Sequence, residues 1–399
     1  MVLSTRLYMP VVTSGTIETY IKGSDDRLSA QRKEAEGLLH EGYKLYQEAE
    51  KNGYVHPDMT IDSLEENLRC FDFTILSHTD SLNSDKLREF ADRGLNPISL
   101  RSVCTWGSKP ADDTLLKAVI DFYEENNAQP GEAKLAAVSD FPHGWSSPAK
   151  KAKNIARLRE LDPEAKYLVD IDNVIDIRAW LDGDKEKVRE GLAAEVKACV
   201  EHGFYMKCII SAAAHAHAGE NKAYGSDYFA SIYDLTTMVL EEMHKQGLDG
   251  AVKSSTGLAA QPGLNHLVSK DDGAMHVKAL PRWMAIRDFN EKHGTSYTCK
   301  ESGGVDHPVH AFVSRTLVTK ILGEEAADKM MIGGGPDFRN SSLELMAEMG
   351  DPRISRARDC GPYQGRFGDL SRLPVYAMGI PRTSAGQQVE PDHSPDLGI

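Results

Sequence analysis

The sequence predicts an α/β fold, a (β/α)8 TIM barrel with an extra N-terminal helical segment and a C-terminal extension. Eight short apolar runs recur along the chain, and helical patterns separate them, which is the alternation typical of a parallel sheet. A length of 399 residues suits one barrel with additions. A doubly wound open sheet is the competing fold, but no G-x-G-x-x-G motif follows the first run.

Residues 1–65 form the predicted N-terminal helical extension. Between Leu28 and Lys51, apolar residues such as Leu39, Tyr43 and Tyr46 recur at roughly helical spacing among Glu and Lys residues. This pattern predicts one amphipathic helix that covers one end of a larger domain.

The predicted barrel domain spans residues 66–350. Its strand-like runs lie at 70–77, 97–104, 134–142, 166–175, 205–214, 250–257, 296–304 and 329–335. Clear helical patterns fill several of the intervals, at 146–161, 184–203 and 226–247. Strands and helices in this order predict closure into a barrel.

Residues 351–399 form the predicted C-terminal extension, in which Pro, Gly, Arg and Ser dominate. The tail beyond about residue 383 has almost no apolar content, and we expect it to be disordered. The basic segment PRISRAR (352–358) is either a solvated face or a patch that attracts an anionic substrate.

The charge and composition exclude several classes of protein. The formal net charge is −14, which disfavours binding to nucleic acid or to an anionic membrane. No apolar run reaches the ~18–20 residues of a membrane helix, and the N-terminus lacks the features of a signal peptide. The six cysteines include no C-x-x-C pair. We therefore expect a cytoplasmic protein with no metal, compatible with a homo-oligomer.

Charged residues inside the apolar runs are the candidates for chemistry, because barrel active sites lie at the carboxyl ends of the strands. These residues are Asp72 in the first run, Asp170 and Asp172 in the fourth, Lys207 in the fifth, Lys253 in the sixth and Lys300 in the seventh. A single buried lysine is more often a structural ion-pair partner. Adjacent barrel strands lie about 5 Å apart, so two lysines on neighbouring strands can bring their ammonium groups close together, which favours a functional pair instead.

Such a pair has a chemical use, because a lysine attacks a carbonyl only when its amine is neutral. At an ordinary pKa only about one lysine in 2,500 is neutral at pH 7. A neighbouring cation and a dry site lower the pKa of the amine. We predict that Lys207 and Lys253 form this pair and that Asp172 moves protons to and from the covalent intermediate.

Short segments in order along residues 68–348 resemble the motifs of one known family. FDFTIL (71–76) is similar to D-x-T-x-L, SVC (102–104) to A-V-C, and SDFPHG (139–144) to N-F-P-x-G. VDIDNVIDIRAWLDGD (169–184) aligns with the family's fourth-strand segment. MKCII (206–210) resembles K-V-I-I, VKSSTG (252–257) resembles I-K-T-S-T-G, and KESGGV (300–305) resembles K-P-A-G-G-V. The family is that of the deoxyribose-phosphate aldolases, class I aldolases built on a TIM barrel.

The resemblance implies an aldehyde-lyase that needs no cofactor and works through a Schiff base. It implies that Lys207 forms the Schiff base, that Lys253 tunes this nucleophile, and that Asp172 relays the proton. The implied reaction is the reversible cleavage of 2-deoxy-D-ribose 5-phosphate to acetaldehyde and D-glyceraldehyde 3-phosphate. The implied partner is therefore a small aldehyde or sugar phosphate.

A phosphate would be held near the ends of the last three strands. Backbone N–H groups and hydroxyls are available there at Gly257, Gly303, Gly304, Gly334, Gly335, Ser341 and Ser342. If the three glycines at 333–335 do not bind phosphate, they form a simple turn. Two departures from the family, Ser211-Ala212-Ala213 in place of E-T-G and the inserted PDFRN (336–340), leave open a different, non-phosphorylated substrate.

Two other classes of function remain as alternatives. His215 and His217 form an H-x-H, which metal-dependent barrel hydrolases use to bind metal ions, although here it follows the fifth run. A non-catalytic barrel is the third hypothesis, and the two lysines in apolar strands argue against it.

Overall fold

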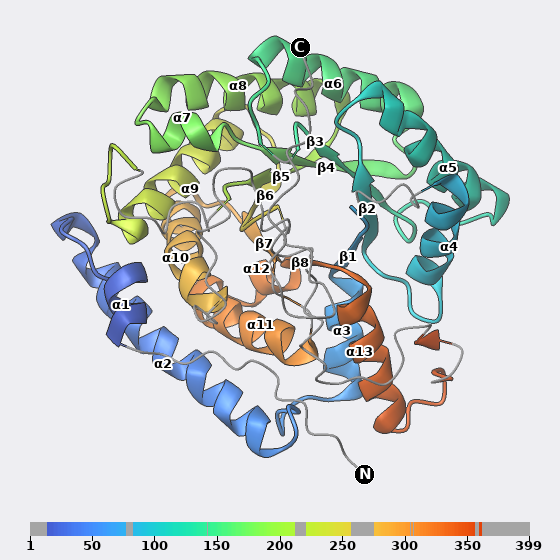
Figure 1. Cartoon of the computed structure of the whole chain (residues 1–399), viewed down its shortest axis with the longest axis horizontal. Helices are drawn as coiled ribbons and strands as arrows, with labels where there is room; N and C mark the ends of the chain where they lie inside the picture. The colour runs from blue at the N-terminus through green and yellow to red at the C-terminus, as the bar shows by residue number, and fades with distance from the viewer. Residues whose placement is uncertain are drawn as a thin grey trace, which may run out of the picture.

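The predicted barrel is present in the computed structural model, which describes residues 14–76, 83–141, 143–211, 221–256, 275–303, 305, 307–355 and 359–360. Eight parallel strands pair in sequence order, and β8 closes on β1 (Figure 1). The strands are β1 (Phe71–Thr74), β2 (Ser102–Trp106), β3 (Leu135–Ser139), β4 (Leu168–Val174), β5 (Tyr205–Ile209), β6 (Gly250–Lys253), β7 (Thr298–Ser302) and β8 (Met331–Gly334). The (β/α)8 fold class is therefore confirmed.

Seven of the eight predicted apolar runs contain one strand each, and the second run overlaps its strand only in part. The run was expected at 97–104, whereas β2 starts at Ser102 and continues to Trp106. Pro97 lacks the N–H that a sheet ladder needs, which disfavours an earlier start. Pairing with β1 begins with the backbone N–H of Arg101, which donates to the carbonyl of Phe71 at 3.1 Å.

Helices surround the barrel (Figure 1). They are α1 (Ser14–Tyr20), α2 (Ser29–Lys51), α3 (Ile61–Arg69), α4 (Ser84–Leu95), α5 (Asp113–Glu125), α6 (Pro148–Leu161), α7 (Ile177–Leu181), α8 (Lys185–His202), α9 (Tyr228–Lys245), α10 (Met275–His293), α11 (Pro308–Leu322), α12 (Glu324–Asp328) and α13 (Pro336–Glu348), with short 3₁₀ turns η1 (Asp26–Leu28) and η2 (Pro110–Asp112). Helices α6, α8 and α9 match the predicted helical patterns. Their starts are capped by side chains, as where Ser147 accepts from the backbone N–H of Lys150.

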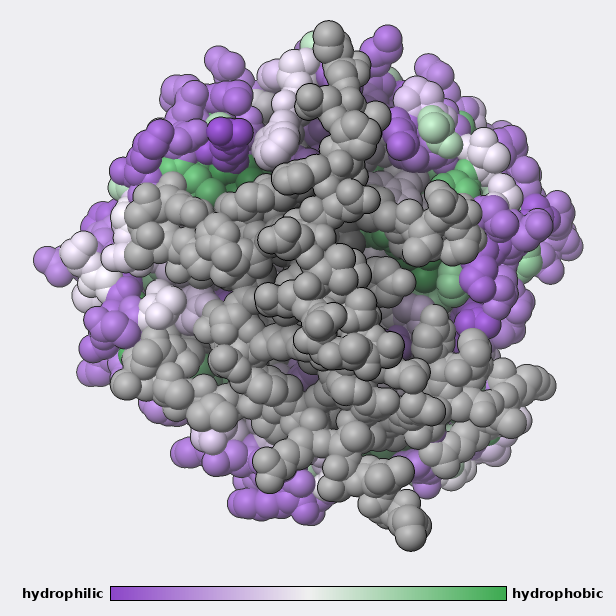
Figure 2. All heavy atoms as spheres, viewed as in Figure 1, coloured by the Kyte–Doolittle hydropathy of each residue, from purple (hydrophilic) through white to green (hydrophobic). Residues whose placement is uncertain are grey.

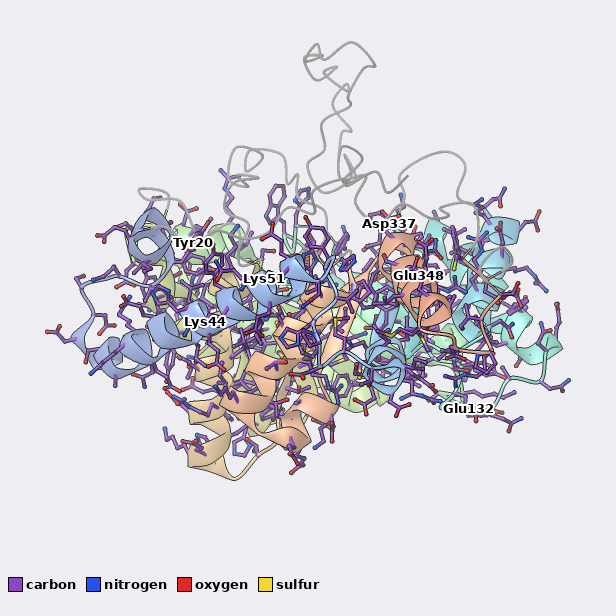
Figure 3. All side chains as sticks on the ribbon, turned by 90° about the horizontal axis from the view of Figure 1, so that it is seen from below. Tyr20, Lys44, Lys51, Glu132, Asp337 and Glu348 are labelled. Atoms are coloured by element: carbon purple, nitrogen blue, oxygen red, sulfur yellow. The ribbon has the colours of Figure 1, made fainter. Side chains whose placement is uncertain are left out.

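The predicted helix between Leu28 and Lys51 is confirmed as α2, which crosses the outside of the barrel (Figure 3). It lies against α10 and α11. Gln31 donates to Asp288 at 2.9 Å, and Arg287 is 2.6 Å from Glu34. The domain boundary at residue 65 stays a prediction.

Most of the predicted C-terminal extension lies outside the described residues, including the tail beyond residue 383. Within the described part of PRISRAR, Arg353 contacts Glu65 at 2.6 Å and Asp351 at 2.8 Å. This arginine is thus partly neutralised by two carboxylates.

The hydrophobic residues form two clusters because alternate side chains of each strand point to opposite sides of the sheet. A large cluster fills the space between the sheet and the helices. A smaller one lies inside the barrel, on the β1–β5 side. The perimeter of the face seen in Figure 2 is mostly hydrophilic. None of the helices in the described part of the chain has the length and hydrophobicity needed to cross a bilayer.

Candidate active site

The interior of the barrel holds a cluster of buried charged side chains. Its members are Asp72, Arg101, Asp170, Asp172, Lys207, Lys253 and Lys300, which come from β1, β4, β5, β6 and β7 and from the residue before β2. The three lysines and three aspartates are all at most 2% exposed. We call these seven residues the charge cluster.

Lys207 lies deep in the charge cluster and is surrounded by carboxylates. Its Nζ is 2.7 Å from Asp72 Oδ2, 2.8 Å from Asp172 Oδ1 and 3.2 Å from Asp170 Oδ2. Burial by itself lowers the pKa of Lys207, but the three carboxylates outweigh it and raise that pKa well above the usual value. Lys207 is therefore a firmly protonated ammonium.

Lys253 and Lys300 share one carboxylate oxygen. Their Nζ atoms lie 2.7 Å and 2.8 Å from Asp172 Oδ2, and Lys300 also contacts Asp72 Oδ2 at 2.6 Å. Lys253 and Lys300 are direct register partners on β6 and β7. Lys253 is thus a neighbour of Lys300, and Lys207 shares Asp72 Oδ2 with Lys300 in the same way.

The pKa of Lys253 shifts in the direction opposite to that of Lys207. Burial lowers the pKa of Lys253, the nearby charge of Lys300 lowers it further, and Asp172 offsets only part of this effect. All three aspartates are ionised: burial alone would raise their pKa values, but the surrounding cations hold them below the usual range.

The predicted pairing of Lys207 with Lys253 stays a prediction: their Nζ atoms lie against the two oxygens of Asp172, although the two residues differ in register. In the register of β5 and β6, Lys253 lies opposite Ile209, while Lys207 lies opposite Ala251, two residues nearer the amino end. A two-residue offset corresponds to about 6–7 Å along a strand. The backbone of Lys207 therefore lies one layer deeper. The neighbouring cation Arg101 lowers the pKa of Lys207, but the three carboxylates outweigh this effect, so the expected net lowering of that pKa is wrong.

Sequence reasoning placed Asp172 in the site, and the structure brings it together with both predicted lysines. Asp72 and Asp170 were expected only as alternative proton carriers to Asp172, and Lys300 was noted as a charged residue in an apolar strand without a role. Arg101 was missed although it lies inside the second predicted run, 97–104, where a charged residue between Leu100 and Val103 was the signal that could have found it.

A wall of apolar side chains lines the barrel interior beside the charge cluster. Its members are Leu76, Cys104, Ala136, Val138, Phe141, Val174 and Ile209, with Trp106 packed against them. Cys104 Sγ is 4.0 Å from Asp172 Oδ2, so the wall meets the cluster directly. Burial raises the pKa of the Cys104 thiol to about 11, and the thiol is therefore uncharged at neutral pH. We call this set the apolar wall.

The predicted phosphate-binding serines lie away from the start of their helix. Helix α13 begins at Pro336, so Ser341 and Ser342 fall in its second turn. Their hydroxyls donate to the carbonyls of Asp337 and Phe338, four residues back in each case. The expectation of two hydroxyls at a helix start is thus wrong, because PDFRN extends the helix toward its amino end.

The glycines that were predicted to bind phosphate lie in different local environments. Gly303 has φ 84°, a conformation that favours glycine. A Cβ on Gly334 would lie 2.9 Å from the Val305 carbonyl oxygen, so close packing accounts for this glycine. Gly335 is the N-cap of α13, and a Cβ there would meet no atom within 4 Å. Gly257 and Gly304 lie outside the described residues.

The first turn of α13 carries Asp337. Viewed from the side, Asp337 lies at one edge of the molecule and Glu132, which precedes β3, at the opposite edge (Figure 3). Asp337 thus marks the face where the strands end. A carboxylate here competes with an anionic ligand for the backbone N–H groups of the helix.

The alternative metal site cannot be placed, because His215 and His217 lie outside the described residues. Within the described ranges, no group of three or more His, Cys, Asp or Glu side chains has an arrangement that could hold a metal ion.

Comparisons with known proteins relate this geometry to solved structures. No protein-family model matches the chain, and no curated protein sequence matches it. Two crystal structures from Toxoplasma gondii ME49, each provisionally described as a deoxyribose-phosphate aldolase, match it with TM-scores of 0.53 and 0.52. They share 17% and 15% sequence identity and cover 73% of this chain, which in turn covers 96% and 98% of theirs. The motif resemblance to these aldolases is thus matched in the fold, and the chain is a (β/α)8 barrel of the same kind as theirs.

Proposed function

We propose that this chain is a class I aldolase in which Lys253 forms the Schiff base. The observation that carries the proposal is the shared oxygen of Asp172, which holds Lys253 beside Lys300 in a buried site. A lysine with a second cation beside it and a dry environment has a larger neutral fraction at pH 7. Lys207 also has cations near it, Arg101 and, on the same oxygen of Asp72, Lys300, but its three carboxylate partners outweigh them and favour its ammonium form.

The proposed substrate is 2-deoxy-D-ribose 5-phosphate in its open-chain form, as the family resemblance implies. The neutral amine of Lys253 attacks the C1 aldehyde, and the carbinolamine takes up a proton on its hydroxyl and loses water to give a protonated imine. A base removes the proton of the C3 hydroxyl, the C2–C3 bond breaks, and D-glyceraldehyde 3-phosphate leaves. The bonding electrons form an enamine, which takes a proton at C2, and hydrolysis then releases acetaldehyde and the free lysine.

Asp172 is the proposed proton carrier for these steps. Its two oxygens lie within hydrogen-bonding distance of the three lysines, including the proposed nucleophile. Its carboxylate is ionised in the resting site, so it can accept a proton from the carbinolamine and return it later. Lys300 disfavours protonation of Lys253, and Lys207 fixes the orientation of Asp172.

The apolar wall supports this chemistry in two ways. Side chains such as Phe141, Val174 and Ile209 exclude water from the imine, which would otherwise hydrolyse early. They also suit the unsubstituted two-carbon part of the substrate, which has no polar group to bind.

Reductive trapping tests the assignment. Borohydride treatment in the presence of acetaldehyde should leave a stable ethyl adduct on Lys253, located by peptide mass mapping. Lys253→Arg is the matched variant, since it keeps the positive charge but removes the amine nucleophile, and it should show no adduct and only background cleavage. An adduct on Lys207 instead would restore the assignment made from the sequence.

A non-phosphorylated substrate is the second candidate, and the start of α13 favours it. The hydroxyls of Ser341 and Ser342 are used inside the helix, and Asp337 places a negative charge in its first turn. A working phosphate site would add charge-assisted hydrogen bonds of about 1.5–3 kcal/mol each. Removing the phosphate would then lower kcat/KM by about a hundredfold or more. Equal kcat/KM for deoxyribose and its 5-phosphate would support the second candidate.

A further inference from the structure

Arg101 closes the amino end of the charge cluster. Its Nη1 donates to Asp72 Oδ1 at 2.8 Å and to Asp170 Oδ2 at 2.5 Å. The two carboxylates are almost fully buried, and the arginine side chain is only 16% exposed. Its guanidinium carbon also lies 5.9 Å from the ring centroid of Tyr205. Arg101 is therefore held in place by three strands and does not reach Lys253.

The charge cluster has one cation more than it has carboxylates. Four cations (Arg101 and the three lysines) face three aspartates. With every group ionised, and counting only the part of the chain that the structure describes, the buried cluster carries one uncompensated positive charge, which is costly in a medium of low polarity. The loss of one proton makes it neutral. Because arginine does not lose its proton in proteins, that proton must come from a lysine.

The contacts select which lysine gives up the proton. Lys207 has three carboxylate partners within 3.2 Å and Lys300 has two. Lys253 has one such partner among the described residues, Asp172, and it shares that oxygen with Lys300. Lys253 is therefore the lysine whose ammonium form is least stabilised.

We infer that Arg101 is a positioning residue that keeps Lys253 neutral, because it occupies Asp72 and Asp170 and so leaves too few carboxylates for all three lysines. This inference rests on the proposed function of Lys253 as nucleophile. Without the charge of Arg101, three lysines and three aspartates balance with every lysine protonated. Removing a unit charge that acts through these shared carboxylates in a protein interior then shifts the titration of Lys253 upward by about one pH unit.

The groups that face Lys253 allow a clean measurement of this effect. They are Asp172 from β4, Lys300 from β7 and Cys104 from β2, with Lys207 and Asp72 one contact further away. Asp172 is ionised and the Cys104 thiol is neutral at pH 7. Asp172 should not titrate between pH 6 and 11, and the Cys104 thiol titrates only at the upper end of this range, near its pKa of about 11. Below that end, a change of charge on Arg101 is read at Lys253 itself.

The test compares Arg101→Met, which removes the charge, with Arg101→Lys, which keeps it. The rate of acetylation of Lys253 by acetic anhydride, followed by mass spectrometry from pH 6 to 11, reports its neutral fraction without any turnover. We expect the midpoint of this pH profile to rise by about one pH unit in Arg101→Met. In Arg101→Lys the midpoint should stay within a few tenths of a pH unit of its original value. Borohydride trapping with acetaldehyde should shift in parallel and recover at high pH.

Asp170→Asn provides a second variant with the opposite expectation. It removes a carboxylate that contacts Arg101 and Lys207 but not Lys253, so the midpoint of Lys253 should fall. An unchanged midpoint in a folded Arg101→Met protein, or an upward shift in Asp170→Asn, would overturn the inference. Another outcome is that acetylation of Lys253 shifts as expected while borohydride and acetaldehyde leave no adduct on Lys253 of the wild-type protein. In that case the inference about Arg101 holds and the proposed aldolase function fails.

Discussion

At the scale of single residues, position within the barrel decides the role of each lysine. Lys207 and Lys253 both interrupt apolar strands, so residue type alone does not separate them. Their difference comes from the number of carboxylates around each ammonium group, three for Lys207 and one among the described residues for Lys253. This number depends on side chains from other strands.

Gly333 provides a residue-scale prediction. A Cβ at this position would lie 2.8 Å from Lys300 Cε and 3.2 Å from Ser302 Cβ. Gly333→Ala should push Lys300 away from Asp172, at a cost of about 1–3 kcal/mol in the free energy of unfolding. Borohydride trapping of acetaldehyde should become slower by about tenfold, which corresponds to about 1.4 kcal/mol in the barrier.

Gly335→Ala is the matched control for this change. A Cβ at Gly335 would have no neighbour within 4 Å, and its φ of −89° suits any residue. Trapping of acetaldehyde, which has no phosphate, should proceed at the original rate. Similar rates in the two alanine variants would argue against a role for the space beside Lys300.

At the scale of elements, the start of α13 is the clearest departure from expectation. The sequence places Pro336 directly after three glycines, and proline is favoured in the first turn of a helix because its missing N–H is not needed there. This signal could have located the helix start at Pro336 rather than near Ser341. The consequence is functional, because it removes two hydroxyls from the expected phosphate site.

Helix α2 provides an element-scale prediction, because it carries two glycines in different surroundings. Gly37 is exposed, and a Cβ there would meet nothing within 4 Å, whereas a Cβ on Gly42 would lie 3.0 Å from Leu317 Cδ1 of α11. Gly37→Ala should raise the free energy of unfolding by about 0.5–1 kcal/mol through helix propensity.

In Gly42→Ala the same gain is opposed by overpacking, so this variant should be less stable than Gly37→Ala by about 1–3 kcal/mol. Urea unfolding monitored by circular dichroism measures both values. An equal gain in the two variants would mean that α2 does not press on α11 as described.

At the scale of the whole molecule, closure of the barrel concentrates the charge. Eight strands bring carboxylates and cations that are more than 200 residues apart, such as Asp72 and Lys300, to 2.6 Å. Breaking one such buried pair leaves an unpaired charge in the interior. The stability of the fold and the state of the site are therefore linked.

Acid unfolding should reveal this link. The pKa values of Asp72, Asp170 and Asp172 lie below their usual range in the folded state, so their contribution to stability is complete above pH ~4 and is lost as the pH falls further. Between pH 5 and pH 3 the three groups together should cost roughly 2–4 kcal/mol. Denaturant midpoints at a series of pH values measure this loss.

The loss should persist in 0.5 M NaCl, because salt screens exposed ion pairs much more than buried ones. A decline in stability that salt abolishes would assign the effect to the surface instead of the charge cluster.

The sequence by itself determined the architecture of this protein and the chemical types in its centre. The eight strands, the helix at Ser29–Lys51 and the helices after β3, β4 and β5 follow from periodicity, which local side-chain alternation encodes directly. The presence of Asp172, Lys207 and Lys253 in one interior follows from charged residues in apolar strands.

The tertiary structure alone decided which of these charges meet. Register places Lys253 beside Lys300 and sets Lys207 one layer deeper, while closure brings Arg101 onto Asp72 and Asp170. The pKa of a buried group depends on the charges within a few ångströms, and these come from strands far apart in the sequence. Periodicity within one strand carries no information about its register with the next, and the role of each lysine is therefore a property of the closed barrel.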